Sequence, residues 1–348
     1  MNRRCDKLLK KMSEKGIDTM LITDMTNVRY FSGFTGSDGY VFVSSDTMLV
    51  VTDSRYTEQA ALQAEGFTVK DIVDFDIASV VSDNAKVGFE NGTISYAAYG
   101  RFAEKIKNLV PTGTLLTDIR SVKEAEETEC IARAASIADA VFEHIIEYMH
   151  PGMSERQAAF ELEMFMRTHG ADGLSFDTIV AAGEHGSMPH AEPSDRLIEN
   201  GDLVVMDYGC TYKGYCSDMT RTVAVGDVSD DKLAVYDLVK KVQSECLDMI
   251  KPGAVCSDIH KYSWEKLNSA YPGCYGHGLG HGVGLEIHER PTLSTRCDVC
   301  LEPGHIVTVE PGLYIAGKCG VRIEDLVLVT KEGYRILSKS TKELVKIH

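Results

Sequence analysis

The stretch Leu203-Val204-Val205-Met206-Asp207-Tyr208-Gly209 places one acidic residue at the end of an apolar run, where a buried strand normally carries another apolar side chain. A second acidic residue, Asp218, follows beyond Tyr212-Lys213-Gly214. With a tight turn centred between residues 212 and 213, the two aspartates oppose each other, with Cβ atoms about 4.5–5.5 Å apart. Carboxylates that close repel unless a cation or a shared proton lies between them.

A second acidic hairpin is predicted near the C-terminus. Thr308-Val309-Glu310-Pro311-Gly312 precedes Gly317, and Val321-Arg322-Ile323-Glu324-Asp325 follows it. A turn centred on Gly317 sets Glu310 opposite Glu324. The alternative is an exposed sheet edge with solvated acids, but the apolar runs Val204–Met206 and Val307–Val309 favour buried strands.

Histidines gather between the two predicted hairpins. The segment Gly276–Glu289 holds His277, His281 and His288 among five glycines, and the whole chain has 11 histidines. Glycines at this density argue against a helix and indicate close approach of the backbone to another group. His190 is a further candidate because it follows a loop rich in Gly, Ser and Pro, and functional residues often lie on loops.

Two aspartates, two glutamates and one histidine form an oxygen-rich ligand set without a thiolate. Such a set can hold two divalent ions with a bridging carboxylate, and Mn²⁺, Co²⁺ and Zn²⁺ all suit it. A pair of ions about 3.5–4 Å apart can activate water and polarise a carbonyl. The predicted chemistry is hydrolysis of an amide.

These motifs resemble the M24 metallopeptidase family, which has the "pita-bread" fold. The resemblance covers about residue 123 to the end and rests on Met206–Gly209, Ser217–Thr222, Gly276–Glu289, Val309–Tyr314 and Val321–Asp325. In the first half, Tyr30–Ser37 and Val51–Ala60 resemble the creatinase-type N-terminal domain. That domain accompanies proline-directed members of the family, and methionine aminopeptidases lack it.

The resemblance implies a role for each matching residue. The implied metal ligands are Asp207, Asp218, His281, Glu310 and Glu324. Asp207 would bind one ion, Asp218 and Glu324 would bridge both, and Glu310 would also act as a proton shuttle.

The same resemblance implies substrate contacts. His190 and His288 would contact the substrate and stabilise the developing oxyanion. His277, Tyr314 and Arg322 would support the proline pocket.

The expected fold has two domains, an α/β domain over residues 1–121 and an α+β pita-bread catalytic domain with an antiparallel sheet over residues 122–348. Within the first, a helix is predicted over residues 2–15. Helices are also predicted over 121–149 and 230–250, and from a capping box at Ser154 and Gln157.

Composition narrows the functional class. The 348-residue chain carries a net charge of −16, which disfavours binding to nucleic acid or to an anionic membrane. No apolar run is long enough to span a membrane, and the N-terminus shows no export signal. Ten scattered cysteines are expected to be reduced in a cytoplasmic protein, and the pair Cys297/Cys300 lacks the partners of a zinc site.

The function predicted from these patterns is that of an Xaa-Pro aminopeptidase, which releases an N-terminal residue preceding proline from a peptide substrate. Proline lacks an N–H and restricts the residue before it, so peptidases that bind extended strands handle this bond poorly. Open alternatives are an Xaa-Pro dipeptidase (prolidase), a broader aminopeptidase and a non-catalytic peptide-binding protein. Intact ligands argue against a creatinase, and the family resemblance implies a homodimer.

Overall fold

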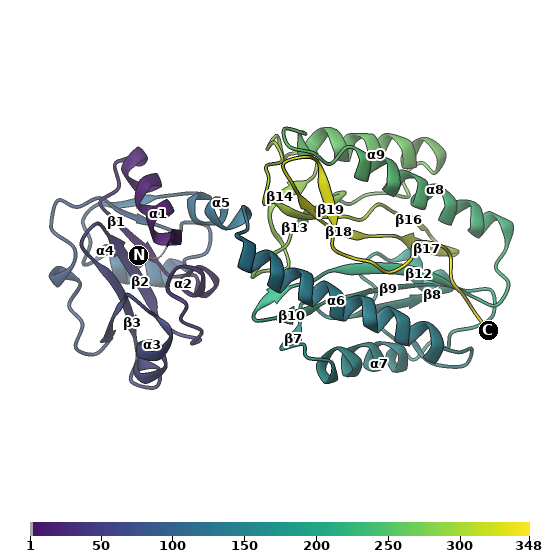
Figure 1. The fold of residues 1–348 in the computed structure, drawn as a ribbon, viewed down its shortest axis with the longest axis horizontal. Coiled ribbons are helices and arrows are strands. Elements are labelled where there is room, and N and C mark those ends of the chain that lie inside the picture. Colours follow the sequence, from purple (N-terminus) through teal and green to yellow (C-terminus); the bar gives the residue numbers. More distant parts are fainter. Residues whose placement is uncertain (1–2) are drawn as a thin grey trace. The chain divides into compact units, whose positions relative to one another are not determined.

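The computed structural model describes residues 3–348 and divides the chain into two compact units, Met1–Arg120 and Ser121–His348 (Figure 1). The expected combination of an α/β domain with an α+β domain is confirmed. No helix among residues 3–348 is long and apolar enough to cross a membrane. All ten cysteines lie in this range and none forms a disulfide there.

The first unit is a mixed six-stranded sheet in the order β4-β3-β2-β1-β5-β6. Its strands are β1 (Thr19–Ile22), β2 (Tyr40–Ser44), β3 (Met48–Thr52), β4 (Thr68–Asp71), β5 (Val87–Phe89) and β6 (Leu109–Pro111). Its helices are α1 (Arg3–Lys15), α2 (Met25–Ser32), α3 (Thr57–Gln63), η1 (Ile77–Ser79), α4 (Tyr96–Ala103) and α5 (Leu115–Ser121), the last of which ends at the unit boundary. The predicted helix over 2–15 corresponds to α1, with residue 2 outside the described residues. Helix α1 is amphipathic because its apolar residues recur at intervals of three and four, and it buries Cys5, Leu8 and Met12.

In the second unit, one half of the core lies between a sheet and two helices. The helices are α6 (Ala125–Tyr148) and α7 (Glu155–Thr168), and the sheet has the order β20-β12-β9-β8. Its strands are β8 (Ile179–Ala182), β9 (Leu203–Tyr208), β12 (Met219–Val225) and β20 (Lys346–Ile347). The predicted capping box at Ser154 and Gln157 is present and starts α7.

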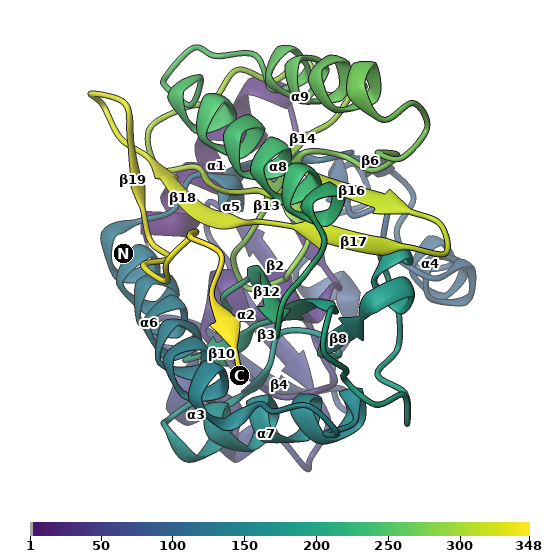
Figure 2. The ribbon, with the colours of Figure 1, turned by 90° about the vertical axis from the view of Figure 1, so that its right-hand side faces the viewer.

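The other half of the second unit repeats this plan. Its sheet has the order β14-β13-β15-β18-β19, with strands β13 (Gly280–Gly282), β14 (Glu289–Leu293), β15 (Ile306–Val309), β18 (Asp325–Val329) and β19 (Tyr334–Ile336). It is covered by α8 (Asp230–Asp248) and α9 (Cys256–Ala270). In both views of the second unit, α8 and α9 lie on one side of the strands and α6 and α7 on the other (Figures 1 and 2).

Short strands connect the two halves. The pair β16 (Gly312–Ile315) and β17 (Cys319–Arg322) extends the hairpin of β15 and β18, and β17 contacts both β9 and β12. A three-stranded sheet joins β7 (Gly173–Leu174), β10 (Cys210–Tyr212) and β11 (Tyr215–Cys216). The ends of strands from both halves therefore meet in the middle of the unit.

Candidate functional site

The five predicted ligand residues come from both halves of the second unit. Asp207 lies in β9 and Asp218 directly precedes β12, whereas His281 lies in β13. Glu310 follows β15, and Glu324 lies between β17 and β18. Asp218, Glu310 and Glu324 directly flank strands, Asp207 stands one residue before the end of β9, and His281 is the central residue of the short strand β13.

The predicted register of the first hairpin is wrong by two residues. Asp207 pairs with Thr220, not with Asp218. The turn is centred between Lys213 and Gly214, which both have positive φ (49° and 79°). Because side chains alternate between faces with a period of two, a shift by two residues leaves Asp218 on the face of Thr220 and Asp207.

The predicted register of the second hairpin is confirmed. Val309 pairs with Asp325 on one side of the acidic pair, and Gly312 pairs with Arg322 on the other. Glu310 and Glu324 therefore oppose each other about Gly317, which has a φ of 68°. The glycine supplies this left-handed conformation without steric cost.

The acidic side chains converge on one point. One carboxylate oxygen each of Asp207, Asp218 and Glu324 lies within 4.8 Å of the others. His281 Nε2 lies 3.4 Å from Asp218 Oδ2 and 3.2 Å from Glu310 Oε1. The structure thus brings together all five predicted ligands.

Two carboxylate oxygens of this cluster have no hydrogen-bond donor. Asp207 Oδ1 and Glu324 Oε1 are buried and accept no hydrogen bond, although a buried carboxylate normally has its lone pairs satisfied. Burial raises the pKa of Asp207, and burial together with the charge of Glu324 raises the pKa of Asp218 well above its ordinary value. Burial and the neighbouring Glu310 do the same for Glu324. Such a cluster needs positive charge at its centre.

The remaining ligands are oriented by hydrogen bonds outside the cluster. His281 Nδ1 lies 3.0 Å from the carbonyl oxygen of Gly282, to which it can donate, so that Nε2 points at the acids. Burial would raise the pKa of Glu310, but the hydrogen bond and charge of His281 lower it to about 2. The donor set and the unpaired oxygens fit divalent metal ions.

Two threonines that sequence reasoning did not single out hold two of the acids. Thr220 Oγ1 donates to Glu324 Oε2 at 2.8 Å, and Thr308 Oγ1 donates to Glu310 Oε1 at 2.9 Å. Each hydroxyl leaves the second carboxylate oxygen free for another partner. The sequence could have indicated Thr220, because it stands two residues after Asp218 and a spacing of two places both side chains on the same face of a strand.

A chain of hydrogen bonds extends from Asp207 to His277. Arg322 Nη2 donates to Asp207 Oδ2 at 2.5 Å, and Arg322 Nη1 donates to Tyr314 Oη at 2.7 Å. Tyr314 Oη lies 3.0 Å from His277 Nε2, and His277 Nδ1 lies 2.7 Å from the Gly278 carbonyl. Burial lowers the pKa of His277 and raises that of Tyr314, so the tyrosine hydroxyl donates to a neutral imidazole.

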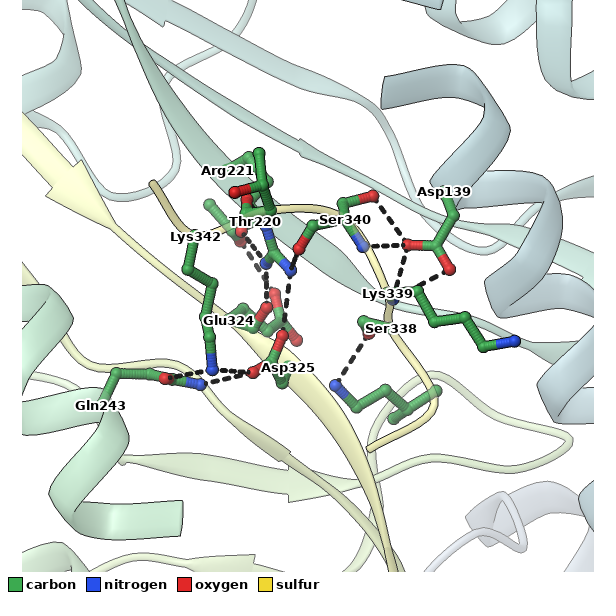
Figure 3. Close-up of polar contacts among 12 residues, drawn as sticks. Asp139, Thr220, Arg221, Gln243, Glu324, Asp325, Ser338, Lys339, Ser340 and Lys342 are labelled. Atoms are coloured by element: carbon green, nitrogen blue, oxygen red, sulfur yellow. Dashed lines mark hydrogen bonds and ion pairs between the residues drawn. The ribbon is translucent and has the colours of Figure 1, made fainter. Parts of the chain in front are cut away.

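On the outer side of the ligand strands lies a buried ion pair (Figure 3). Arg221, next to Thr220 in β12, donates to Asp325 Oδ1 at 2.9 Å and also to the carbonyl of Glu324. Lys342 and Gln243 donate to the other oxygen of Asp325. Consecutive residues of β12 therefore bond to consecutive acids of the second hairpin, Thr220 to Glu324 and Arg221 to Asp325.

His190 and His288 line a cleft of about 570 Å³. Asp207, Asp218 and Glu310 line the same cleft. The rings of His288 and His281 are 4.4 Å apart, and burial and the neighbouring His281 lower the pKa of His288. His288 is therefore neutral at pH 7 and can donate one N–H into the cleft.

Comparison with known proteins finds two family models that match the two halves of the chain. Residues 129–331 match the model described as "Metallopeptidase family M24", and residues 4–122 match "Creatinase/Prolidase N-terminal domain". An Xaa-Pro dipeptidase from Pyrococcus furiosus is 37% identical over 349 residues, which cover 99% of this chain and 100% of the relative.

Two solved structures are similarly related. An Xaa-Pro dipeptidase from Bacillus anthracis has 42% identity and a TM-score of 0.94, with 99% of both chains covered. An X-Pro aminopeptidase from Thermotoga maritima has 35% identity and a TM-score of 0.89, with 99% of this chain and 100% of that chain covered.

Proposed function

The chain belongs to metallopeptidase family M24, and on that premise we propose that it is a metal-dependent Xaa-Pro dipeptidase. The observation that carries the proposal is the convergence of Asp207, Asp218, His281, Glu310 and Glu324 at one end of a cleft that also holds His190 and His288. The sequence patterns by themselves favoured an Xaa-Pro aminopeptidase. The curated relative from Pyrococcus furiosus and the structure from Bacillus anthracis favour the dipeptidase.

Metal ions held by the five ligands would polarise the scissile carbonyl and activate a water molecule as the nucleophile. We propose two ions per subunit, with manganese as the native metal. The buried, unpaired oxygens of Asp207 and Glu324 support a demand for more positive charge than one histidine supplies.

The chain's own groups have separate tasks in this proposal. Glu310, ionised at neutral pH, takes a proton from the attacking water and passes it to the leaving proline nitrogen. The neutral His288 donates an N–H group to the oxyanion that develops on the scissile carbonyl, and His190, which lines the same cleft, donates a second one. Arg322 orients Asp207 through its hydrogen bond, and its charge opposes the rise that burial causes in the Asp207 pKa.

Substrate length separates the two proline-directed functions. The test is release of alanine from Ala-Pro and from Ala-Pro-Ala, with added Mn²⁺ and after chelation. Metal-dependent cleavage of Ala-Pro with little cleavage of the tripeptide supports the dipeptidase. Preferred cleavage of the tripeptide supports the aminopeptidase, which the 35% identity to the Thermotoga maritima X-Pro aminopeptidase keeps as the second candidate. Failure of both substrates refutes proline-directed hydrolysis.

We further propose that the protein acts as a cytoplasmic homodimer on small peptides and binds neither nucleic acid nor membranes. The net charge of −16 supports the exclusion of nucleic acid and anionic membranes, and cysteines that form no disulfide within residues 3–348 support the cytoplasmic location. The homodimer rests on the family resemblance. Sedimentation equilibrium measures the subunit number, and metal analysis of the purified protein identifies the native ion. A monomer, or a native ion other than manganese, contradicts the corresponding part of the proposal.

A further inference from the structure

The loop that follows β8 carries His190 into the cleft. It begins with η2 (Gly183–Ser187) and returns towards β9 through residues 188–202. His190 is exposed and lines the cleft beside Asp207 and Asp218. A donor on a loop this long contributes to catalysis only if the loop holds it in place.

The base of this loop is closed by one carboxylate. Glu155, the first residue of α7, is 0% exposed. Its Oε1 accepts a hydrogen bond from the backbone N–H of Ala182 at 2.8 Å. Its Oε2 accepts from the N–H of Ser194 at 3.0 Å and from the Ser194 hydroxyl at 2.6 Å. His185 Nδ1 lies 2.8 Å from both oxygens.

These donors lie on both sides of His190 along the chain, two before it and two after it. Placing a carboxylate in the interior is costly unless every oxygen is satisfied. Glu155 meets this condition only while the two ends of the loop remain together. Any excursion that separates Ala182 from Ser194 takes donors away from at least one oxygen of this buried carboxylate, so the loop is restrained.

Two further contacts restrain the loop, at Pro189 and at Gly186. Arg322 Nη1 donates to the carbonyl of Pro189 at 3.2 Å, which connects the residue before His190 to the Asp207 partner. Gly186 packs directly on Gly320 of β17, where a Cβ atom on Gly320 would lie 1.7 Å from the Gly186 oxygen. The loop is thus held at its base, at Gly186 and at the residue before His190.

We infer that Glu155 is a positioning residue for catalysis: it fixes the loop from Ala182 to Ser194 so that His190 faces the reacting carbonyl. This inference rests on the proposed peptidase function. Glu155 lines neither the cleft nor the ligand cluster, so its effect has to pass through the loop.

The variant E155Q tests the inference because it keeps the size of the side chain and replaces one acceptor oxygen with an NH₂ group. That group must face an N–H of Ala182 or Ser194. We expect kcat/KM for Ala-Pro to fall about 100-fold, mainly in kcat, since a displacement near 1 Å can cost that much. Mn²⁺ affinity measured by calorimetry should stay within about threefold, because no ligand is touched.

The matched control is E161Q. Glu161 lies on the same helix and also pairs with a histidine, with Oε1 2.6 Å from His144 Nε2, but it contacts no part of the loop. We expect its kcat/KM to stay within about twofold of wild type. If E155Q and E161Q have the same activity, Glu155 has no positioning role.

A double-variant cycle shows whether the effect passes through His190. If it does, E155Q/H190A is no less active than H190A alone, because there is no histidine left to misplace. Additive losses would overturn the inference, as would loss of Mn²⁺ binding in E155Q. If E155Q does not fold, S194A replaces it, with an expected loss of about tenfold for one hydrogen bond to a charged group, and unchanged activity overturns the inference.

The proposed function and this inference fail in different ways. Absence of Ala-Pro and Ala-Pro-Ala cleavage by the wild type refutes the function. Hydrogen exchange at the Ala182 and Ser194 amides tests the restraint independently of turnover, and we expect both to exchange at least tenfold faster in E155Q. Unchanged exchange refutes the restraint even in an active enzyme.

Discussion

Substituting Lys123 by methionine should destabilise the second unit by about 3–5 kcal/mol. Lys123 Nζ lies 2.9 Å from Glu289 Oε2, and the side chains are 1% and 3% exposed. Methionine fills much of the same volume but leaves the Glu289 carboxylate buried without its cation. Removing one member of a buried ion pair is far more costly than removing both, because the remaining charge has lost its compensation.

The double variant K123M/E289Q separates this effect from lost packing. A glutamine at 289 keeps an oxygen for the N–H of Glu286, which donates to Glu289 Oε1 at 3.2 Å. We expect the double variant to recover at least about 2 kcal/mol relative to K123M, since it removes the buried charge that has lost Lys123.

Urea unfolding of the chelated proteins, followed by tryptophan fluorescence, measures both changes. Trp264 is the single tryptophan of the chain and lies on α9, so the signal reports on the second unit. Equal m-values are needed for the comparison. A K123M loss below about 1 kcal/mol, or a double variant as unstable as the sum of the single ones, would refute the ion-pair argument.

Three further predictions concern other parts of the chain. D218N should raise the melting temperature of the chelated protein, because it removes one of several mutually repelling buried carboxylates. It should also abolish the rise in melting temperature that Mn²⁺ causes, because Asp218 is a proposed ligand, and an undiminished rise in scanning fluorimetry would contradict this. G320A should reduce kcat/KM for Ala-Pro more than about tenfold, because its Cβ would meet the Gly186 oxygen; G100A, whose Cβ meets nothing within 4 Å, is the control, and equal activities would count against the contact. Burial raises the pKa of Glu90 above its ordinary 4.5, so its protonated form stabilises the first unit at low pH and that stability is lost as pH rises through the raised pKa. The stability difference between wild type and E90Q in thermal unfolding should therefore fall from pH 4 to pH 7, and a rise would refute the sign.

The sequence predicted the register of one acidic hairpin correctly and that of the other incorrectly. The register about Gly317 was predicted correctly because a glycine marks the turn. The register of Asp207 was predicted two residues away because the turn places Lys213 at positive φ, which non-glycine residues seldom adopt. Both predictions assigned the acids to the correct face, since an error of two residues preserves the alternation of side chains.

Helix α9 was not predicted, for a different reason. The residues it buries include Cys256, His260 and Ser263 alongside Ile259 and Leu267. They follow helical spacing, but three of the five are not among the strongly apolar residues on which a periodicity argument depends. Packing against α8 and β14 supplies the stabilisation that local pattern does not reveal.

By itself the sequence determined the types of ligand, the two-domain plan and the family, because these depend on short motifs and on local periodicity. Only the tertiary structure decided which groups complete the site. Arg322 meets Asp207 across 115 residues of chain, and Glu155 meets Ser194 across 39. Such contacts depend on how two sheets and their loops pack, and no local sequence pattern shows which residues that far apart in the chain will meet.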